Sequence, residues 1–227
     1  MGEIKTNVDK KNVNYNAKNV SSVNSIGRMS TQQEMILAER EKTAAVETMV
    51  LDAALEPAKI PMDKRMDYLF PDGIPKTQSE LEKYMVSVDI VITDKSGKTR
   101  TVAIKVHEKL AGTYQAIFKE LNKAGYVVEP GKINGSDYMN AYEYRPMRNS
   151  SSLSHHSYGS AIDINVPENP YIVNGKNQTG GAWKPGENPL SIEPDGIVVK
   201  TFDKYGFEWG GNWQNSKDYM HFTYTGG

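Results

Sequence analysis

Residues 154–165, with the sequence SHHSYGSAIDIN, place an aspartate inside an apolar alternation. Ile162 and Ile164 occupy one face of this segment and Asp163 the other, because successive side chains of a strand point to opposite faces. A carboxylate flanked by apolar neighbours is costly unless another group pairs with it. The pattern therefore predicts a strand over residues 160–166 and indicates either an ion pair or a metal ligand at Asp163.

Few side chains of this chain could bind a metal beside that aspartate. The sequence has 4 histidines and no cysteine, which excludes thiolate sites and disulfide frameworks. The segment DYMHF, residues 218–222, supplies Asp218 and His221 three positions apart. Two histidines and one aspartate would leave the fourth position of a tetrahedral zinc open, which is typical of a catalytic site. A further carboxylate nearby could take a proton from water.

Length and charge narrow the class of protein. The chain has 227 residues, enough for one ordinary domain with an extension. With 27 basic and 28 acidic residues and no basic stripe, a nucleic-acid partner is not expected. No apolar run approaches the roughly 20 residues of a membrane-spanning helix. The first residues also lack the apolar core of a secretory signal, so either the protein is made without one or the signal has been removed.

The N-terminal part differs in composition from the rest. Residues 1–29 are rich in Asn, Lys and Ser without a stable period, which predicts a disordered polar arm. A helix and linker are expected over 30–65, with Ser30 or Thr31 as the cap and Pro57 as the end. This helix could dock on the domain, pair with another chain or act as a spacer. No candidate functional residue lies in either segment, so both are expected to be dispensable for chemistry.

Residues 66–227 are expected to form the main domain. Alternating apolar residues around a DKSG turn predict a hairpin with one buried face over 86–106. Apolar residues at helical spacing predict a helix over 108–124, with His107 as a boundary residue, and a shorter helix near 195–206. A stretch rich in Pro, Asn and Gly predicts a loop from 167 to 192.

The motifs of this domain resemble those of the zinc D-alanyl-D-alanine carboxypeptidase family. The stretch SHHSYGSAID fits the family signature S-x-H-x-x-G-x-A-x-D, and EWGGNW…DYMHF is similar to its W-G-G…[DE]-x-x-H block. YRPMRNSSSLS resembles the segment that carries the family's catalytic arginine, and INVPENPY resembles the strand exit of the L-alanyl-D-glutamate endolysins. Vancomycin-resistance dipeptidases and the hedgehog signalling domain are further relatives. The resemblance covers roughly residues 66–227.

The resemblance implies one Zn²⁺ per chain and a set of three ligands: His156, Asp163 and His221. Counting from Ser154, the histidine of the motif is His156, and we interpret His155 as a loop residue. Asp218 would be the general base. Arg145 is the first choice for the arginine that polarises the scissile carbonyl.

Further residues are expected at the substrate. Arg148 is the second candidate for the catalytic arginine, because spacing does not separate it from Arg145. Arg148, Ser154 and Trp213 are expected to bind substrate. Trp209 is expected to pack beneath the site and to be less exposed than Trp213.

The expected function is zinc-dependent hydrolysis of a peptide bond in the peptidoglycan stem peptide, by a D,D-carboxypeptidase or an L,D-type endopeptidase. The alternative is a non-catalytic, zinc-stabilised module that binds cell wall or protein, although such a module would need neither Asp218 nor Arg145. The expected fold is α+β, a small, mainly antiparallel sheet with helices on one face and zinc on the other. The expected location is extracytoplasmic or the cell wall, or else the cytoplasm before release by a phage.

Overall fold

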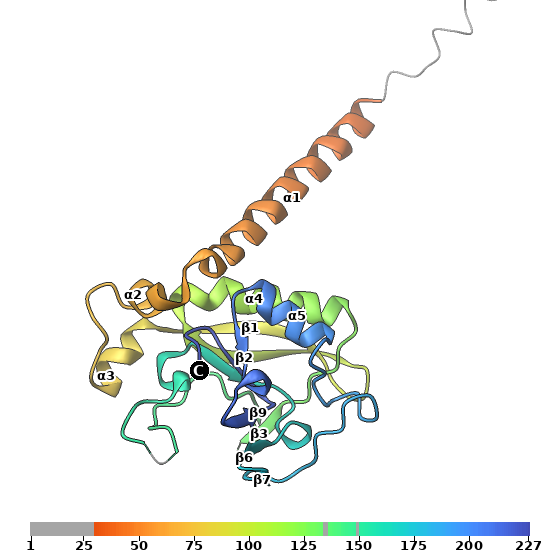
Figure 1. The fold of residues 1–227 in the computed structure, drawn as a ribbon. Helices are drawn as coiled ribbons and strands as arrows, with labels where there is room; N and C mark the ends of the chain where they lie inside the picture. Colours follow the sequence, from red (N-terminus) through yellow and green to blue (C-terminus); the bar gives the residue numbers. More distant parts are fainter. Residues whose placement is uncertain (1–29, 134–135, 149) are drawn as a thin grey trace, which may run out of the picture. The chain divides into compact units, whose positions relative to one another are not determined.

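The computed structural model of this chain describes residues 30–133, 136–148 and 150–227 (Figure 1). The expected polar arm, residues 1–29, lies outside the described residues. The chain divides into two compact units, Met1–Val46 and Glu47–Gly227. The second unit begins well before the expected boundary at residue 66, and it contains every candidate site residue.

Helix α1 spans Thr31–Leu55 and begins at the predicted cap. The backbone N–H of Gln33 donates to Ser30 Oγ at 3.3 Å, and the N–H of Ser30 donates to Gln33 Oε1 at 2.9 Å. These reciprocal bonds form a capping box with Ser30, one of the two predicted caps. α1 ends two residues before Pro57, which lies in the short helix η2 (Glu56–Lys59).

The segment after α1 is bound tightly to the rest of the second unit. Ala54 at the end of α1 is buried, and its carbonyl accepts from Thr113 Oγ1 at 2.9 Å. Pro57 O accepts from the buried Tyr224 hydroxyl at 2.8 Å. The guanidinium of Arg65, which begins α2 (Arg65–Leu69), donates to the carbonyl of Tyr224 at 2.7 Å. Residues 54–65 are therefore part of the packed domain and not a free linker.

A long hairpin supports one side of the core. Strands β1 (Met85–Thr93) and β2 (Thr99–His107) pair antiparallel and bury alternate apolar residues, as the sequence predicts. Helix α4 (Ala111–Lys123) buries Tyr114, Ile117, Phe118 and Leu121 in the same core. His107 lies at the boundary between β2 and the following helices, where its Nδ1 accepts from the N–H of Lys109 at 3.2 Å.

The remaining strands form small antiparallel sheets instead of one continuous sheet. One sheet has the order β5–β10–β8, another is β3–β4, and a third has the order β7–β6–β9. Their bounds are β3 Gly131–Ile133, β4 Ser136–Tyr138, β5 Ala161–Asp163, β6 Tyr171–Val173, β7 Lys176–Asn177, β8 Glu208–Trp209, β9 Ser216–Asp218 and β10 His221–Thr223. The expected loop over 167–192 thus contains two short strands.

Short helices complete the unit. They are η3 Met62–Lys64, α3 Gln78–Leu81, η4 Glu82–Tyr84, η5 Glu108–Leu110, η6 His155–Tyr158, η7 Val166–Glu168, α5 Ile197–Lys204 and η8 Gly210–Asn212. α5 falls within the predicted span 195–206. Among the described residues no helix is long and apolar enough to cross a membrane.

Helices and candidate site occupy opposite faces of β10. Figure 1 shows α4 and α5 together on one side of the strands, with β6, β7 and β9 on the other. Phe222 of β10 stacks on Phe202 of α5, with ring centroids 4.1 Å apart. The neighbouring His221 points to the opposite face, because side chains alternate along a strand. The expected α+β architecture is confirmed, with the helices on one face and a group able to hold a metal on the other.

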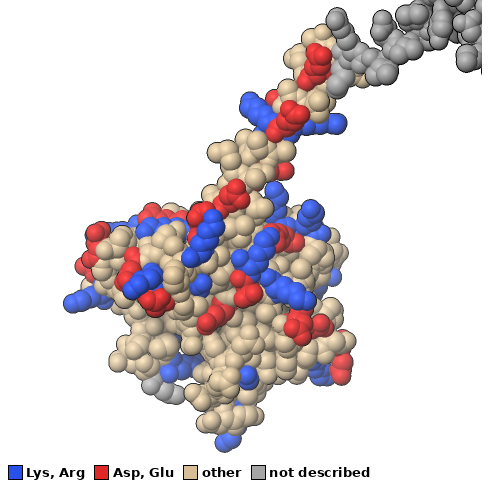
Figure 2. Space-filling model, turned by 45° about the horizontal axis from the view of Figure 1, so that its top comes forward, with Lys and Arg blue, Asp and Glu red and all other residues tan. Residues whose placement is uncertain are grey.

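Charge on the surface is mixed. On the face drawn in Figure 2, lysines and arginines alternate with aspartates and glutamates over the body of the second unit. This pattern agrees with a formal net charge of −1 for the chain. Neither positive nor negative charge therefore dominates the electrostatic field of that face.

Candidate metal centre and active site

Asp163 and His221 are placed by strand pairing. They are direct partners in the antiparallel pair of β5 and β10. Side chains of directly opposed residues lie on the same face, about 4.5–5.5 Å apart at Cβ. A one-residue slip of either strand would turn one of the two side chains into the core, so the centre depends on this register.

His156 comes from the short helix η6, which sits against the hairpin. Ser154 caps this helix, and its Oγ accepts from the N–H of His156 at 3.4 Å. Gly159 ends it in the left-handed conformation, at φ 60. A Cβ at Gly159 would lie 2.5 Å from the backbone nitrogen of His107, so both the conformation and the space require glycine. The sequence motif therefore encodes a bend that brings His156 over β5.

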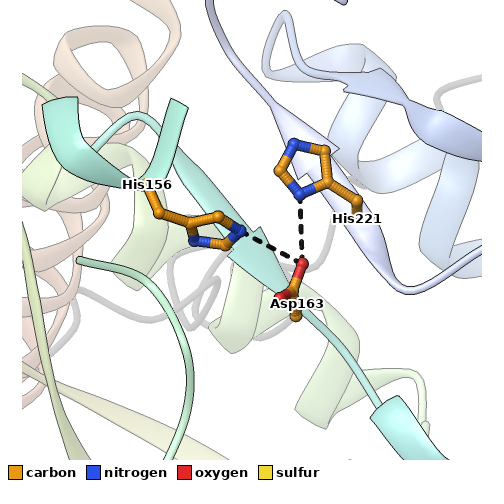
Figure 3. Close-up of side chains that lie close together, drawn as sticks. All are labelled: His156, Asp163 and His221. Carbon is orange, nitrogen blue, oxygen red and sulfur yellow. Dashed lines mark hydrogen bonds and ion pairs between the residues drawn. The ribbon is translucent and has the colours of Figure 1, made fainter. Parts of the chain in front are cut away.

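The three side chains converge on one point, as Figure 3 shows. His156 Nε2 lies 3.3 Å from Asp163 Oδ1, and His221 Nδ1 lies 3.0 Å from the same oxygen. The ligand atoms all lie within 4.8 Å of one another. Donors about 2.0–2.1 Å from a tetrahedral zinc lie about 3.3–3.4 Å from each other. The residues thus fit a single metal ion with one coordination position left open.

Two further groups orient these ligands. His156 Nδ1 lies 3.3 Å from the carbonyl of Ala141. The second oxygen of Asp163, Oδ2, accepts from Asn140 Nδ2 at 2.9 Å. Such partners fix the tautomer of a ligating histidine and the direction of a carboxylate. The role of Asn140 could not be predicted from the sequence, because its segment has no motif. A backbone hydrogen bond brings Asn140 to the site: the N–H of Asp163 donates to the carbonyl of Asn140 at 3.0 Å.

Electrostatics hold the aspartate ionised. Burial by itself would raise the pKa of Asp163, but His156 and His221 more than offset this effect and keep the pKa well below its ordinary value. Burial lowers the pKa of His221, with the Asp163 carboxylate opposing. Burial would lower the pKa of His156, but the Asp163 carboxylate raises it overall. A divalent metal requires an ionised carboxylate and neutral imidazoles, so a bound metal would take the place of a proton that Asp163 attracts to the histidines.

Asp218 lies beside these three residues but is not part of the group that could hold a metal. It ends β9, where it pairs with Tyr171 of β6, and it lines the same cavity. Burial raises the pKa of Asp218 to about 7, with a further increase from Asp163, while His156, Arg148 and Arg145 oppose. Its Oδ1 is buried and has no hydrogen-bond partner among the described residues. A carboxyl group that titrates near neutral pH and has one oxygen without a partner in the described part of the chain suits a general base.

The glycines of the WGG motif allow close packing around Asp218 and Trp209. A Cβ at Gly210 would lie 2.6 Å from the carbonyl oxygen of Asp218. A Cβ at Gly211 would lie 2.4 Å from the indole of Trp209. Both contacts are too close for any side chain, so the motif packs β9 and its aspartate onto η8. Trp209 is buried beneath, and its Nε1 donates to Tyr219 O at 2.8 Å, while Trp213 is only half-buried, as the sequence predicts.

The two candidate arginines have different surroundings. Arg145 Nε donates to Glu143 Oε2 at 2.7 Å, and its backbone N–H donates to Ser157 Oγ at 3.0 Å. The guanidinium of Arg148 lies 5.8 Å from the ring centroid of Tyr171, and the side chain is exposed. Both line the cavity with Asp218. The contact of Glu143 with Arg145 could not be predicted from the sequence, because no motif includes Glu143.

The cavity in front of the metal ligands has a volume of about 590 Å³. Besides both arginines and Asp218, its walls include three residues from the motifs: Ser154, His155 and Trp213. Ser154 is 5% exposed, and its hydroxyl already caps η6. The His155 ring lies 5.9 Å from that of His221 and outside the group of possible ligands. Burial lowers the pKa of His155 to about 4, which leaves it neutral at pH 7.

Fold and site together define an α+β protein with three residues that could hold a metal and, beside them, a carboxylate whose Oδ1 has no partner among the described residues. Residues 148–224 match the family model described as D-alanyl-D-alanine carboxypeptidase, which confirms the resemblance to this family of zinc peptidases. The match spans Asp218 and the three residues that could hold a metal, and it supports a peptidase. No curated protein and no solved structure matches the chain.

Proposed function

We propose that the second unit is a zinc-dependent peptidase that cleaves a peptide bond of the peptidoglycan stem. One Zn²⁺ per chain would be held by His156, Asp163 and His221. The family match supports peptidase action, and its description as D-alanyl-D-alanine carboxypeptidase fits a bond of the peptidoglycan stem. The observation that carries the proposal is Asp218, a half-buried residue that lines the same cavity as His156, Asp163 and His221 and whose buried Oδ1 has no partner among the described residues.

Each remaining group has a chemical role in hydrolysis. A zinc ion bound here would polarise the scissile carbonyl and lower the pKa of a water molecule to about 7. Asp218 accepts the proton of the attacking water and later returns it to the leaving amine. Arg145, held by Glu143, carries the positive charge that stabilises the developing oxyanion. Arg148, Ser154 and Trp213 line the cavity where the substrate would lie.

Asp218 also argues against the rival function, a zinc-stabilised binding module. Burying an ionisable group without a partner lowers the stability of the fold, and a module that only binds gains nothing from it. Either a D,D-carboxypeptidase or an L,D-type endopeptidase would use the same groups. With this substrate, the expected place of action is the cell wall or the extracytoplasmic space, reached by export or by release from a phage-infected cell.

The proposal is tested by digesting purified peptidoglycan with the zinc-loaded chain and identifying the new termini by mass spectrometry. We expect one new amino terminus or one released D-amino acid, depending on the bond. Asp218→Asn keeps the size of the side chain but cannot accept a proton, so cleavage should fall by at least about 10². A wild-type chain with full zinc that cleaves no stem peptide would favour the binding module.

A further inference from the structure

A second cavity lies next to the metal cavity and has no part in the proposed hydrolysis. Its volume is about 580 Å³, and it lies between helix α5, strand β8 and the segment 212–216. Trp213 lines both cavities. The indole Nε1 of Trp213 is buried against Gly227, another lining residue of the second cavity, and has no acceptor among the described residues. The Trp213 side chain therefore forms a wall common to both cavities.

The lining of this cavity combines three kinds of group. Amides come from Asn212, Gln214 and Asn215, and carboxylates from Asp203 and Glu208. Apolar surface comes from Val199, Phe207, Trp209 and Trp213. No lysine or arginine is among the described residues that line it. The metal cavity differs, because Arg145 and Arg148 are in its walls.

These groups match a neutral sugar better than a peptide with free carboxylates. Sugar hydroxyls both donate and accept hydrogen bonds, as amides do, and they donate to carboxylates. The C–H face of a sugar ring packs against aromatic surface. A free carboxylate of a peptide would be repelled by Asp203 and Glu208, whereas the arginines of the metal cavity would attract it.

We propose that this second cavity binds an N-acetylated amino sugar of the glycan strand while the stem peptide attached to it enters the metal cavity. The proposal deepens the proposed function and rests on it for the identity of the substrate. The side chain groups assigned to the sugar are Asn212, Asn215 and Asp203, with Trp213 between sugar and peptide.

The position of the sugar limits which bond reaches the metal. An extended peptide spans about 3.3–3.6 Å per residue. The bond after the first stem residue thus lies only a few ångströms from the sugar attachment, whereas a terminal bond four residues along lies about 14 Å away. Only the Trp213 side chain is shared between the cavities, so their proximity favours cleavage close to the glycan.

Direct binding is the first test and does not depend on catalysis. The zinc-loaded full chain is titrated with the disaccharide of N-acetylglucosamine, and amide and indole resonances are followed by NMR. We expect the Trp213 indole N–H resonance to shift. The double variant Asn212→Ala/Asn215→Ala should bind about tenfold more weakly, because each lost hydrogen bond is worth a factor of about 2–10. Gln78→Ala, an exposed amide on α3, is the matched control and should bind as the wild type does.

Cleavage is the second test. The substrates are a stem peptide still linked to its disaccharide and the same peptide released from the sugar. We expect wild-type kcat/KM to be at least about tenfold higher for the linked form, with cleavage after the first residue, and the double variant to lose this preference. Absence of disaccharide binding at millimolar concentration, or an unchanged preference in the double variant, would overturn the inference. A wild type that cleaves neither substrate contradicts the proposed function, and the titration still decides whether the cavity binds sugar.

Discussion

His221 and Asp163 face each other across the paired strands β5 and β10, with His221 Nδ1 3.0 Å from Asp163 Oδ1. The third residue of the group that could hold a metal, His156, approaches the same oxygen from a helix of four residues. The centre therefore combines one contact fixed by the register of a sheet with another fixed by a tight bend. A substitution can therefore disturb the strand register or the bend without disturbing the other.

The choice between adjacent histidines is the first prediction. His156→Ala should lose most of the bound zinc, because Nε2 of His156 lies 3.3 Å from Asp163 Oδ1. His155→Ala should keep about one equivalent, because the His155 ring lies outside the ligand group. Zinc stoichiometry measured on both purified variants by atomic emission decides between them. The opposite result would mean that the motif begins one residue earlier.

Two glycines in left-handed conformation give a matched pair for the bend. Gly175 has φ 71 with open space around its Cβ position, and Gly159 has φ 60 with backbone atoms at 2.5 Å. Gly175→Ala should cost only the conformational strain, about 1–2 kcal/mol. Gly159→Ala should destabilise the fold by clearly more and weaken zinc binding, because η6 must move away from β2. Equal unfolding free energies in urea for the two variants would contradict the steric argument.

The motifs were sufficient to predict which three residues form a group that could hold a metal, but not the residues that contact this group. His156, Asp163 and His221 lie in segments whose spacing reflects local chain geometry, a bend and two strands. Asn140 and Glu143 come from a stretch without a pattern, and only long-range backbone pairing brings them to the site. The spacing of residues along the sequence does not predict a contact of this kind.

The loop over 167–192 shows the same limit in the fold. Its Pro, Asn and Gly content predicts irregular structure, yet it contains β6 and β7. Buried amides organise it: Asn169 Nδ2 donates to Leu190 O at 2.8 Å, and Asn169 Oδ1 accepts from the N–H of Ile192 at 2.7 Å. Asn165, at φ 48, donates to Val127 O at 3.0 Å. Asparagine in a sequence predicts a turn, but not which distant backbone it will bind.

Shortening the N-terminus tests where the domain begins. A chain starting at Glu47 should fold and bind zinc, because it retains the whole second unit. A chain starting at Asp63 loses the contacts of Ala54 with Thr113 and of Pro57 with Tyr224. Each buried hydrogen bond leaves a partner unsatisfied, at about 1–3 kcal/mol. The melting temperature of the shorter chain should therefore be lower, and equal values would restore the expectation that all of residues 1–65 are dispensable.

Substitutions of Arg145 and Arg148 should have different effects on the steady-state kinetic constants. Arg145→Ala removes a guanidinium fixed by Glu143 at 2.7 Å, so kcat should fall by about 10²–10³. Arg148→Ala removes an exposed cation near Tyr171 and should mainly raise KM. Glu143→Gln should lower kcat by less than Arg145→Ala, since it loosens the arginine without removing it. A larger loss of kcat in the Arg148 variant would give that residue the oxyanion role.

Asp218 should destabilise the metal-free fold in a pH-dependent way. Burial raises the pKa of Asp218 to about 7, against about 3.9 for an unfolded aspartate. A group with a raised folded-state pKa contributes stability below its unfolded pKa and loses that contribution as pH rises through the folded value. Asp218→Asn stays neutral, so its stability relative to wild type should increase between about pH 4 and pH 7 and then level off, by at most about 4 kcal/mol.

This difference is measured as the melting temperatures of wild type and Asp218→Asn at pH 4, 5.5, 7 and 8 with a chelator present. Asp195→Asn, at an exposed position, controls for the loss of one carboxylate. With zinc bound, the gain at pH 8 should shrink, because the metal's positive charge stabilises the ionised Asp218 of the wild type. A variant more stable than wild type without metal and unable to cleave with it would show that Asp218 is retained for chemistry at the expense of stability. Equal melting temperatures at all four pH values would mean that the carboxylate is not strained in the fold, and the argument for a general base would lose its main support.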